Sequence, residues 1–252
     1  MLRVRVIPCL LLRARGLVKT TKFKTPNYIG DPINTVRIFN EKEVDELIFL
    51  DITATAEQKK PQFNLISEIA GECFMPFAYG GGIRSLEDAS KLFSLGVEKI
   101  SLNSYAYENS DFITQAANCF GSQSIVISID VKKKMNGYTV YTQGGKIDTG
   151  IDPVNYAKKM EESGAGELLL NSIDRDGTMA GYDLELIYSI TSAVKIPVIA
   201  CGGAGKLEHF TQAVKTGHAS AVAAGSMFVY QGINRSVLIN FPSQDELKLA
   251  LH

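Results

Sequence analysis

An aspartate at the end of an apolar run is the first residue placed for acid–base chemistry. Asp130 closes the run "SIVISID", so a buried strand here would present its carboxylate at the strand end, where it could donate or accept a proton. The alternative is an aspartate that only caps the following loop. An earlier run, "VIPCLLL", carries Leu11 near its end. Leucine cannot transfer a proton.

Glycine, asparagine and serine follow other apolar runs, in two similar sets of loops. The sets are Gly81-Gly82 with Asn103-Ser104, and Gly202-Gly203 with Gly225-Ser226. Glycine lets backbone N–H groups approach a phosphate closely, and helix N-termini add a favourable dipole. The same glycines could serve only tight turns. Because there are two sets, we favour an elongated ligand phosphorylated at both ends.

Two charged segments could add to an anion site. The segment "RARGLVKT" contains Lys19, which could meet an anion or simply be solvated. The segment "NSIDRDGT" places Asp174 and Asp176 around a turn that ends at Gly177. Turns of this composition use some aspartates structurally, and we expect Asp176 and Gly177 to face the ligand.

Four charged residues stand immediately before apolar runs. They are Arg5, Glu46, Lys99 and Glu167. Strand starts are often charged simply because they meet water. Two residues of each sign could instead form a ring of ion pairs, since buried charges are tolerated when they are paired.

These residues need a fold that brings strand ends together. Short apolar runs rich in β-branched residues alternate with segments of helical periodicity. The predicted strands begin near Arg5, Glu46, Pro76, Lys99, Ser124, Glu167, Pro197 and Ser220. The predicted helices include Asn64–Gly71, Leu86–Leu95, Phe112–Phe120, Val154–Ser163, Leu184–Val194 and Leu207–Thr216. This alternation predicts a (β/α)8 barrel, whose ligand site lies at the C-terminal ends of the strands.

The two halves of the chain are similar to each other. Residues 79–104 resemble residues 201–226, with glycines and a Leu-Glu pair recurring at an offset of 121. A duplicated half-barrel is the simplest explanation, with halves of about 1–121 and 122–240 in a single domain spanning 1–252. A doubly wound open sheet is the structural alternative, but it does not explain two equal halves.

Composition argues against several functional classes. The formal net charge of −1 disfavours a broad surface for nucleic acid or an anionic membrane, and Lys132-Lys133-Lys134 indicate a solvated hairpin arm. The four cysteines lack metal or disulfide spacing, and the three histidines lie away from the strand ends, so we expect no metal and no cofactor. No apolar stretch has the roughly 20 residues that span a bilayer, which predicts a soluble, cytoplasmic protein.

Together these features closely resemble the cyclase subunit of imidazole glycerol phosphate synthase. The resemblance runs from Met1 to about Phe228 and rests on the motifs "IPCL", "GDP", "DELIFLDITA", "GGGI", "FGSQS", "NSIDRDGT" and "ACGGAGKLEHF". It implies a (β/α)8 fold, a lyase-type reaction of histidine biosynthesis, phosphate sites at the two glycine sets, and a heterodimer with a glutaminase subunit.

The resemblance also implies a role for the four charges that precede the strands. In the family, ammonia from the glutaminase enters at the N-terminal face, passes a gate of paired charges and travels through the barrel to the active site. The family's gate positions match Arg5, Glu46, Lys99 and Glu167.

The family's acid–base pair is incomplete in this sequence. Asp130 matches the second of the two aspartates that the family uses, and the first falls on Leu11. Leu11 is also the counterpart of Asp130 in the repeat, 119 residues earlier. Losing one positioned acid or base typically costs about 10²–10⁴ in rate. The basic segment after Leu11 and the tail "INRSVLINFPSQDELKLALH" depart from the family as well.

These departures resemble a group of paralogues from bacterial surface-polysaccharide clusters. There the barrel and its glutaminase are thought to supply ammonia to a separate amidotransferase that amidinates a nucleotide sugar. We therefore predict an ammonia-channelling subunit with a glutaminase partner and a third, amidotransferase partner. The alternatives are a working cyclase that forms imidazole glycerol phosphate, and an inactive interaction protein that binds a phosphorylated small molecule.

Overall fold

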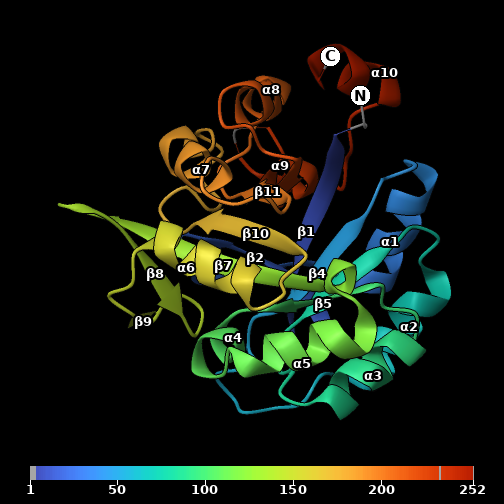
Figure 1. Ribbon diagram of the computed structural model, residues 1–252. Coiled ribbons are helices and arrows are strands. Elements are labelled where there is room, and N and C mark those ends of the chain that lie inside the picture. The colour runs from blue at the N-terminus through green and yellow to red at the C-terminus, as the bar shows by residue number, and fades with distance from the viewer. Residues whose placement is uncertain (1–3, 233, 252) are drawn as a thin grey trace.

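Parallel strands close into a barrel in the computed structural model, which describes residues 4–232 and 234–251. Within these residues, eight strands pair in a closed ring, because β10 pairs with both β11 and β7. The barrel strands are β1 (Arg5–Arg13), β4 (Leu47–Asp51), β5 (Phe77–Gly80), β6 (Lys99–Leu102), β7 (Ile125–Lys134), β10 (Glu167–Ser172), β11 (Val198–Cys201) and β12 (Ala221–Ala224). Helices cover the outside of the ring (Figure 1).

Helices α1 to α8 lie between successive barrel strands, and α9 and α10 follow the last one. They are α1 (Pro32–Glu41), α2 (Phe63–Glu72), α3 (Leu86–Ser94), α4 (Ser104–Glu108), α5 (Asp111–Phe120), α6 (Pro153–Glu162), α7 (Leu184–Thr191), α8 (Leu207–Lys215), α9 (Ser226–Val229) and α10 (Gln244–Leu251), with a short 3₁₀ helix at Ser122–Ser124. Every barrel strand begins within one residue of its predicted start, and the predicted helices are present. The (β/α)8 fold predicted from the sequence is confirmed.

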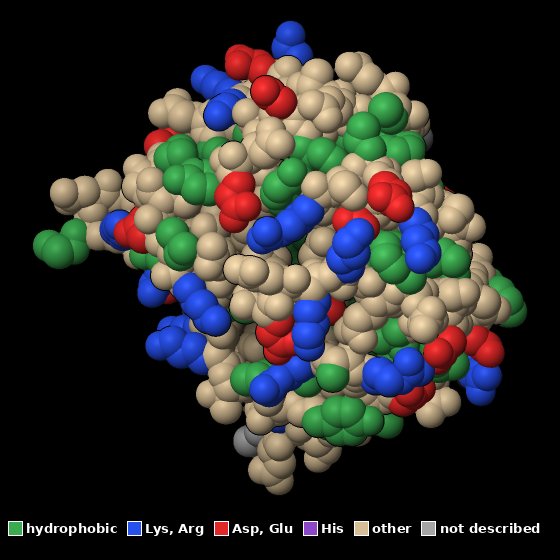
Figure 2. All heavy atoms as spheres, turned by 90° about the horizontal axis from the view of Figure 1, so that it is seen from below, with side chains coloured by type: hydrophobic (Ala, Val, Ile, Leu, Met, Phe, Trp, Pro, Cys, Tyr) green, Lys and Arg blue, Asp and Glu red, His purple; other side chains and the backbone are tan. Residues whose placement is uncertain are grey.

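Antiparallel hairpins extend two strands beyond the barrel. The first hairpin adds β2 (Gly16–Thr21) and β3 (Lys24–Gly30) to β1, and the second adds β8 (Gly137–Thr142) and β9 (Ile147–Asp148) to β7. The segment around Lys19 is therefore a strand and not an open loop, because Leu17 and Val18 are buried and pair with β1. The β7–β8 arm projects from the body in both views (Figures 1 and 2).

Two helix starts repeat at the spacing seen in the sequence. Asp31 precedes α1 and Asp152 precedes α6, 121 residues apart. Each carboxylate accepts a hydrogen bond of 2.9 Å from a backbone N–H three residues later, and proline follows each aspartate. The fixed φ of proline suits the first helical position, and the carboxylate satisfies one N–H that the helix leaves free.

Side chains alternate along each strand between two cores. Outward-facing residues pack against the helices in the larger core. Inward-facing residues form a smaller core inside the ring, made of Ile7, Cys9, Ile48, Ala78, Val126, Leu169, Ile199, Cys201, Ala221 and Ala223. Positions inside the ring thus recur every second residue, and the functional side chains follow this spacing.

The C-terminal segment packs against α1, α8 and α9. The chain passes through a short hairpin of β13 (Tyr230–Gln231) and β14 (Ser236–Val237). Phe241 is then buried with its ring centroid 6.4 Å from Phe39 of α1 and 5.0 Å from Phe228 of α9. Finally α10 packs against α8, where the Thr211 hydroxyl donates to the carbonyl of Ala250.

The repeated helix caps lead to a stability prediction. Replacing either aspartate, by Asp31→Ala or Asp152→Ala, should lower the free energy of unfolding by about 1 kcal/mol, because a helix N–H loses its acceptor. The variants Asp31→Asn and Asp152→Asn keep an acceptor and should lose much less. Urea unfolding of the four variants measures both effects. Equal losses for asparagine and alanine would contradict the capping role.

Candidate functional site

Four charged side chains meet at the N-terminal end of the barrel. Arg5 contacts both Glu46 and Glu167, and Lys99 Nζ lies 2.9 Å from an oxygen of each of the same carboxylates. Cations and anions therefore alternate around the ring. The structure joins in one network the four residues that precede apolar runs in the sequence, and we call this network the charged ring.

Burial makes the members of the charged ring depend on one another. Glu46 and Glu167 are only 3% and 4% exposed, so both carboxylates rely on the two cations in place of water. Burial by itself would lower the pKa of Arg5, but the negative charges of Glu167 and Glu46 raise it above its ordinary value. Removing one cation would leave two buried carboxylates facing a single positive charge.

Apolar side chains separate the charged ring from the other end of the barrel. Ile7, Ile48 and Leu169 each stand two residues after a member of the ring, on β1, β4 and β10. Because inward positions recur every second residue, these side chains form the next layer inside the barrel. A small molecule that passes the ring therefore meets apolar surface on these three strands, whereas Ser101 holds the same place after Lys99 on β6.

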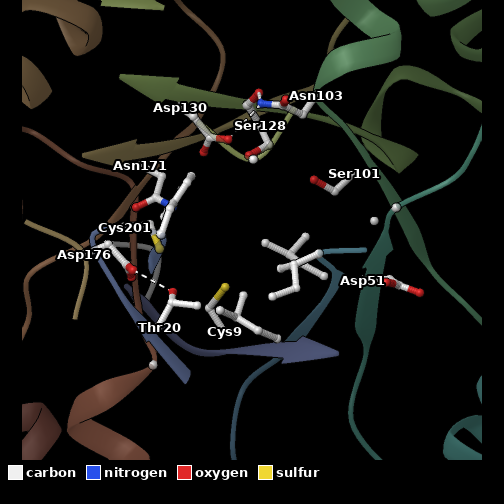
Figure 3. A pocket seen from close by; sticks show the side chains of 18 of the residues that line it. Cys9, Thr20, Asp51, Ser101, Asn103, Ser128, Asp130, Asn171, Asp176 and Cys201 are labelled. Carbon is white, nitrogen blue, oxygen red and sulfur yellow. Dashed lines mark hydrogen bonds between the residues drawn. The ribbon is translucent and has the colours of Figure 1, made fainter. Parts of the chain in front are cut away.

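A cavity of about 240 Å³ lies at the C-terminal ends of the strands. The residues predicted for phosphate binding and for proton transfer all line it: Leu11, Lys19, Gly82, Asn103, Ser104, Asp130, Asp176, Gly177, Gly203, Gly225 and Ser226. Figure 3 shows Asp130, Asn103 and Asn171 along one side of this space. The fold thus gathers residues that lie up to 215 residues apart in the sequence, from Leu11 to Ser226.

Asp130 is a buried acid whose pKa lies near neutrality. Its side chain accepts a hydrogen bond of 3.2 Å from Asn103 Nδ2. Burial, helped by the negative charge of Asp176, raises the pKa of Asp130 from 3.8 to about 7, although a hydrogen bond from Asn171 acts in the opposite direction. Both the acid and the carboxylate are therefore populated near neutral pH, which suits a group that donates or accepts a proton.

Leu11 faces the same cavity from the other half of the repeat. It pairs in register with Leu50 of β4, which also lines the cavity. These two leucines form an apolar wall, whereas Ser101, Ser128 and Asn171 on β6, β7 and β10 make the other side polar. The cavity therefore has Asp130 on its polar side and a hydrocarbon side chain, Leu11, at the counterpart position.

Lys19 forms a buried ion pair with Asp176. Lys19 Nζ lies 2.8 Å from Asp176 Oδ1, and the Thr20 hydroxyl donates to Asp176 Oδ2 at 3.0 Å. Lys19 is only 6% exposed, so it is not the solvated side chain that the sequence left open as an alternative. The ion pair fixes the β2–β3 hairpin to the loop after β10.

The glycines at the cavity have a steric reason to be there. Gly177 has φ of +71°, and a Cβ at this position would lie 2.3 Å from the carbonyl of Thr20. Gly203 has φ of +116°, and a Cβ there would lie 2.2 Å from the carbonyl of Gly181. These contacts require glycine even without a ligand, so phosphate binding at the loops stays a prediction.

The two serines of the predicted phosphate loops differ in their hydrogen bonds. The Ser104 hydroxyl donates to Asn103 Oδ1 and accepts from the backbone N–H of Gln143. The Ser226 hydroxyl is buried and has no partner among residues 4–232 and 234–251. Ser226 is therefore the serine whose hydroxyl is available to a ligand.

Other aspartates near the strand ends have structural roles. Asp51 accepts hydrogen bonds from the backbone of Thr53 and Ala54, the Thr53 hydroxyl and Gln62 Nε2, all between 2.9 and 3.1 Å. Its carboxylate points away from the cavity (Figure 3). Asp174 accepts from the backbone N–H of Lys133 at 2.8 Å and so fixes the hairpin arm.

Several cavity residues were not predicted as site residues. Four of them are Cys9, Ser101, Ser128 and Cys201. Each stands two residues before a predicted site residue, so the inward spacing of a strand was the signal that could have identified them.

Two other features, a metal cluster and a membrane-spanning helix, are absent from the described part of the chain. No group of three or more His, Cys, Asp or Glu side chains in it could hold a metal ion, and none of its helices is long and apolar enough to cross a membrane. On the face shown in Figure 2, basic and acidic side chains are interspersed.

The pKa of Asp130 leads to a prediction about stability. Because its pKa in the folded protein is about 7 and its ordinary value is 3.8, the folded chain holds a proton between these pH values that the unfolded chain has released. Stability should therefore fall as the pH rises through this range. The variant Asp130→Asn cannot titrate, so its free energy of unfolding should improve relative to the unmodified protein as the pH rises. Urea unfolding at several pH values measures this, and a constant difference would contradict the raised pKa.

Comparisons with known proteins identify the family. A family model described as "Histidine biosynthesis protein" matches residues 5–234. A protein of Pseudomonas aeruginosa, provisionally named imidazole glycerol phosphate synthase subunit hisF2, is 54% identical over 248 residues, which are 98% of this chain and 99% of that protein. Imidazole glycerol phosphate synthase subunit HisF of Caulobacter vibrioides is 46% identical over 236 residues, 93% of this chain and 91% of its own. The chain belongs to the HisF-like family of imidazole glycerol phosphate synthase subunits.

Proposed function

We propose that this protein receives ammonia from a glutaminase subunit docked at the N-terminal end of the barrel and passes it to the C-terminal mouth. There a third protein, an amidotransferase, uses the ammonia to amidinate a nucleotide sugar for surface polysaccharide. The observation that carries the proposal is the complete charged ring at one end of a barrel that holds Leu11, in place of a second acid, at the other.

The charged ring supports an entrance for ammonia. Its two cations reach toward water, with side-chain exposures of 31% for Arg5 and 19% for Lys99, while its carboxylates are buried. Positive charge at the outer surface repels ammonium but not neutral ammonia. Lys99 holds its carboxylates through a single ammonium group on a flexible chain, so it is the member best suited to move aside.

The carboxylates at the mouth support a loss of cyclase chemistry. The family reaction uses two aspartates, and Asp130 is the one that remains. Asp51 is held by its loop, and Asp176 is paired with Lys19. Neither carboxylate is free to replace the acid missing at Leu11.

A working cyclase is the second candidate. The pKa of Asp130 near 7 and the cavity that retains Lys19 favour it. Two relatives favour the channelling role. They are named hisF2 in Pseudomonas aeruginosa and hisF3 in Vibrio vulnificus, and the second is 47% identical over 253 residues. The numerals distinguish each from another subunit of the same name.

Cyclase activity separates the two candidates. The purified protein, given the family's phosphoribulosyl-formimino substrate and a high concentration of ammonium, should form imidazole glycerol phosphate at least about 10²-fold more slowly than its variant Leu11→Asp, which restores the second acid. Product formation at several protein concentrations measures the rates.

The matched control is Leu11→Asn, which has the size of aspartate but cannot transfer a proton. It should stay as slow as the unmodified protein. If the unmodified protein turns over as fast as Leu11→Asp, the channelling proposal is wrong and the protein is a cyclase.

The charged ring gives a prediction for the complete assembly of barrel, glutaminase and amidotransferase. The variant Lys99→Met should lower the amount of amidinated product per glutamine hydrolysed, because the entrance loses a cation and ammonia escapes. It should also lower stability by about 3–5 kcal/mol, since Glu46 and Glu167 lose a partner. The measurement is the amount of amidinated product relative to the glutamate released by glutamine hydrolysis in the same reaction.

Product formed from external ammonium, which bypasses the glutaminase, shows whether the loss lies at the entrance. The control Lys99→Arg keeps the charge and should keep more of the coupling. An unchanged ratio of product to glutamate in a folded Lys99→Met variant would remove the charged ring from the pathway.

A further inference from the structure

The C-terminal segment reaches the mouth of the barrel through the side chain of Arg235. This arginine lies in the turn between β13 and β14, and β13 directly follows α9. Its Nη2 donates a hydrogen bond of 3.0 Å to the carbonyl of Gly177, and its Nη1 donates one of 3.4 Å to the Thr21 hydroxyl. Gly177 belongs to the turn after β10, whereas Thr21 ends β2. One guanidinium therefore bridges two segments that are far apart in the sequence.

The same two segments carry the ion pair of the cavity. Asp176 directly precedes Gly177, and Lys19 lies on β2. The backbone N–H of Lys22 donates to the carbonyl of Asp176 at 2.9 Å, next to the ion pair between Lys19 and Asp176. We call this contact between the β2–β3 hairpin and the turn at Asp176 and Gly177 the mouth junction. Arg235 is the side chain that the C-terminal segment adds to the mouth junction.

The C-terminal segment also fixes the arginine itself. The guanidinium carbon lies 5.9 Å from the centre of the Tyr230 ring, within reach of a cation–π interaction. The backbone N–H groups of Leu238 and Asn240 donate to carbonyls of α9 at 3.0 and 2.9 Å. Phe241 is buried between aromatic rings of α1 and α9. The β13–β14 hairpin is thus held on the body of the barrel, and Arg235 has a defined place from which to act.

The chemistry of the contacts suits an arginine. Both oxygens that accept from Arg235 are uncharged, one a backbone carbonyl and one a hydroxyl. Arg235 therefore adds to the ion pair between Lys19 and Asp176 without replacing either partner. A planar guanidinium can donate to two acceptors at once, whereas the ammonium of lysine is a single point of charge. A charged donor also makes a stronger hydrogen bond than a neutral one.

We propose that Arg235 is a positioning residue for the cavity, which keeps the mouth junction closed and so holds Lys19 and Asp176 together at the cavity wall. Without it the β2–β3 hairpin leaves the turn more often, and the buried ammonium of Lys19 meets water. The tail that departs from the family then has a role at the mouth. This inference does not rest on the proposed function, because it concerns the shape of the cavity for either candidate activity.

Hydrogen exchange and amine labelling of the full-length protein test the proposal. In Arg235→Met, backbone amides in residues 17–28 and 174–178 should exchange about 10-fold faster, because opening no longer breaks a hydrogen bond from a charged donor. Lys19 is only 6% exposed, so an acylating reagent reaches it when the junction opens, and its labelling should also be about 10-fold faster. Mass spectrometry measures both. Arg235→Lys keeps one cationic group and should fall between the two proteins.

The controls separate the mouth junction from general loosening of the protein. Arg37→Met removes another exposed arginine, which donates two hydrogen bonds to Glu72, and should leave residues 17–28 unchanged. Amides of α10 should exchange equally in Arg235→Met and the unmodified protein. Because Arg235 is exposed, the variant should fold, and a thermal melt verifies this; if it does not fold, Arg235→Lys serves for the same comparison.

Two results would overturn the proposal. The first is unchanged exchange of residues 17–28 and unchanged labelling of Lys19 once Arg235 is replaced. The second is an acceleration that is as large in α10 as at the mouth junction, since Arg235 would then stabilise only the C-terminal segment.

Discussion

The spacing of side chains along parallel strands in a closed ring is the constraint on which the rest of the structure depends. Every second residue faces the interior. Along β1 this rule places Arg5 at the entrance, Ile7 in the apolar layer, Cys9 in the floor of the cavity and Leu11 at its wall. A shift of pairing by one residue would turn all four outward. Because the other strands obey the same rule, charge, hydrocarbon and polar groups form successive layers.

Buried charge is handled differently at the two ends of the barrel. At the entrance each carboxylate has two cationic partners. At the mouth, Lys19 and Asp176 neutralise each other, whereas Asp130 has amide partners only and lies near the negative charge of Asp176. The entrance is thus a site of paired charges, and the mouth holds an acid whose pKa is raised to about 7.

The similarity of the two halves in fold contrasts with their differences in chemistry. Both halves carry a hairpin after their first strand, and α1 and α6 share an aspartate cap. The first hairpin supplies Lys19 to the cavity, however, and Asp130 has Leu11 as its counterpart. The two halves can share a backbone without sharing the reacting groups. Strand alternation and helix capping require only a residue of the right class, apolar or hydrogen-bonding. Proton transfer requires a carboxylate at one defined position.

The sequence by itself determined the barrel, its strand starts, the residues at each strand end and the four charges that meet at the entrance, because period-two and helical patterns are local properties of the chain. Only the tertiary structure decided which side chains interact with one another. It paired Lys19 with Asp176, committed Asp51 to its loop and raised the pKa of Asp130. These outcomes depend on contacts between segments up to 157 residues apart and on burial. No spacing along the chain encodes them.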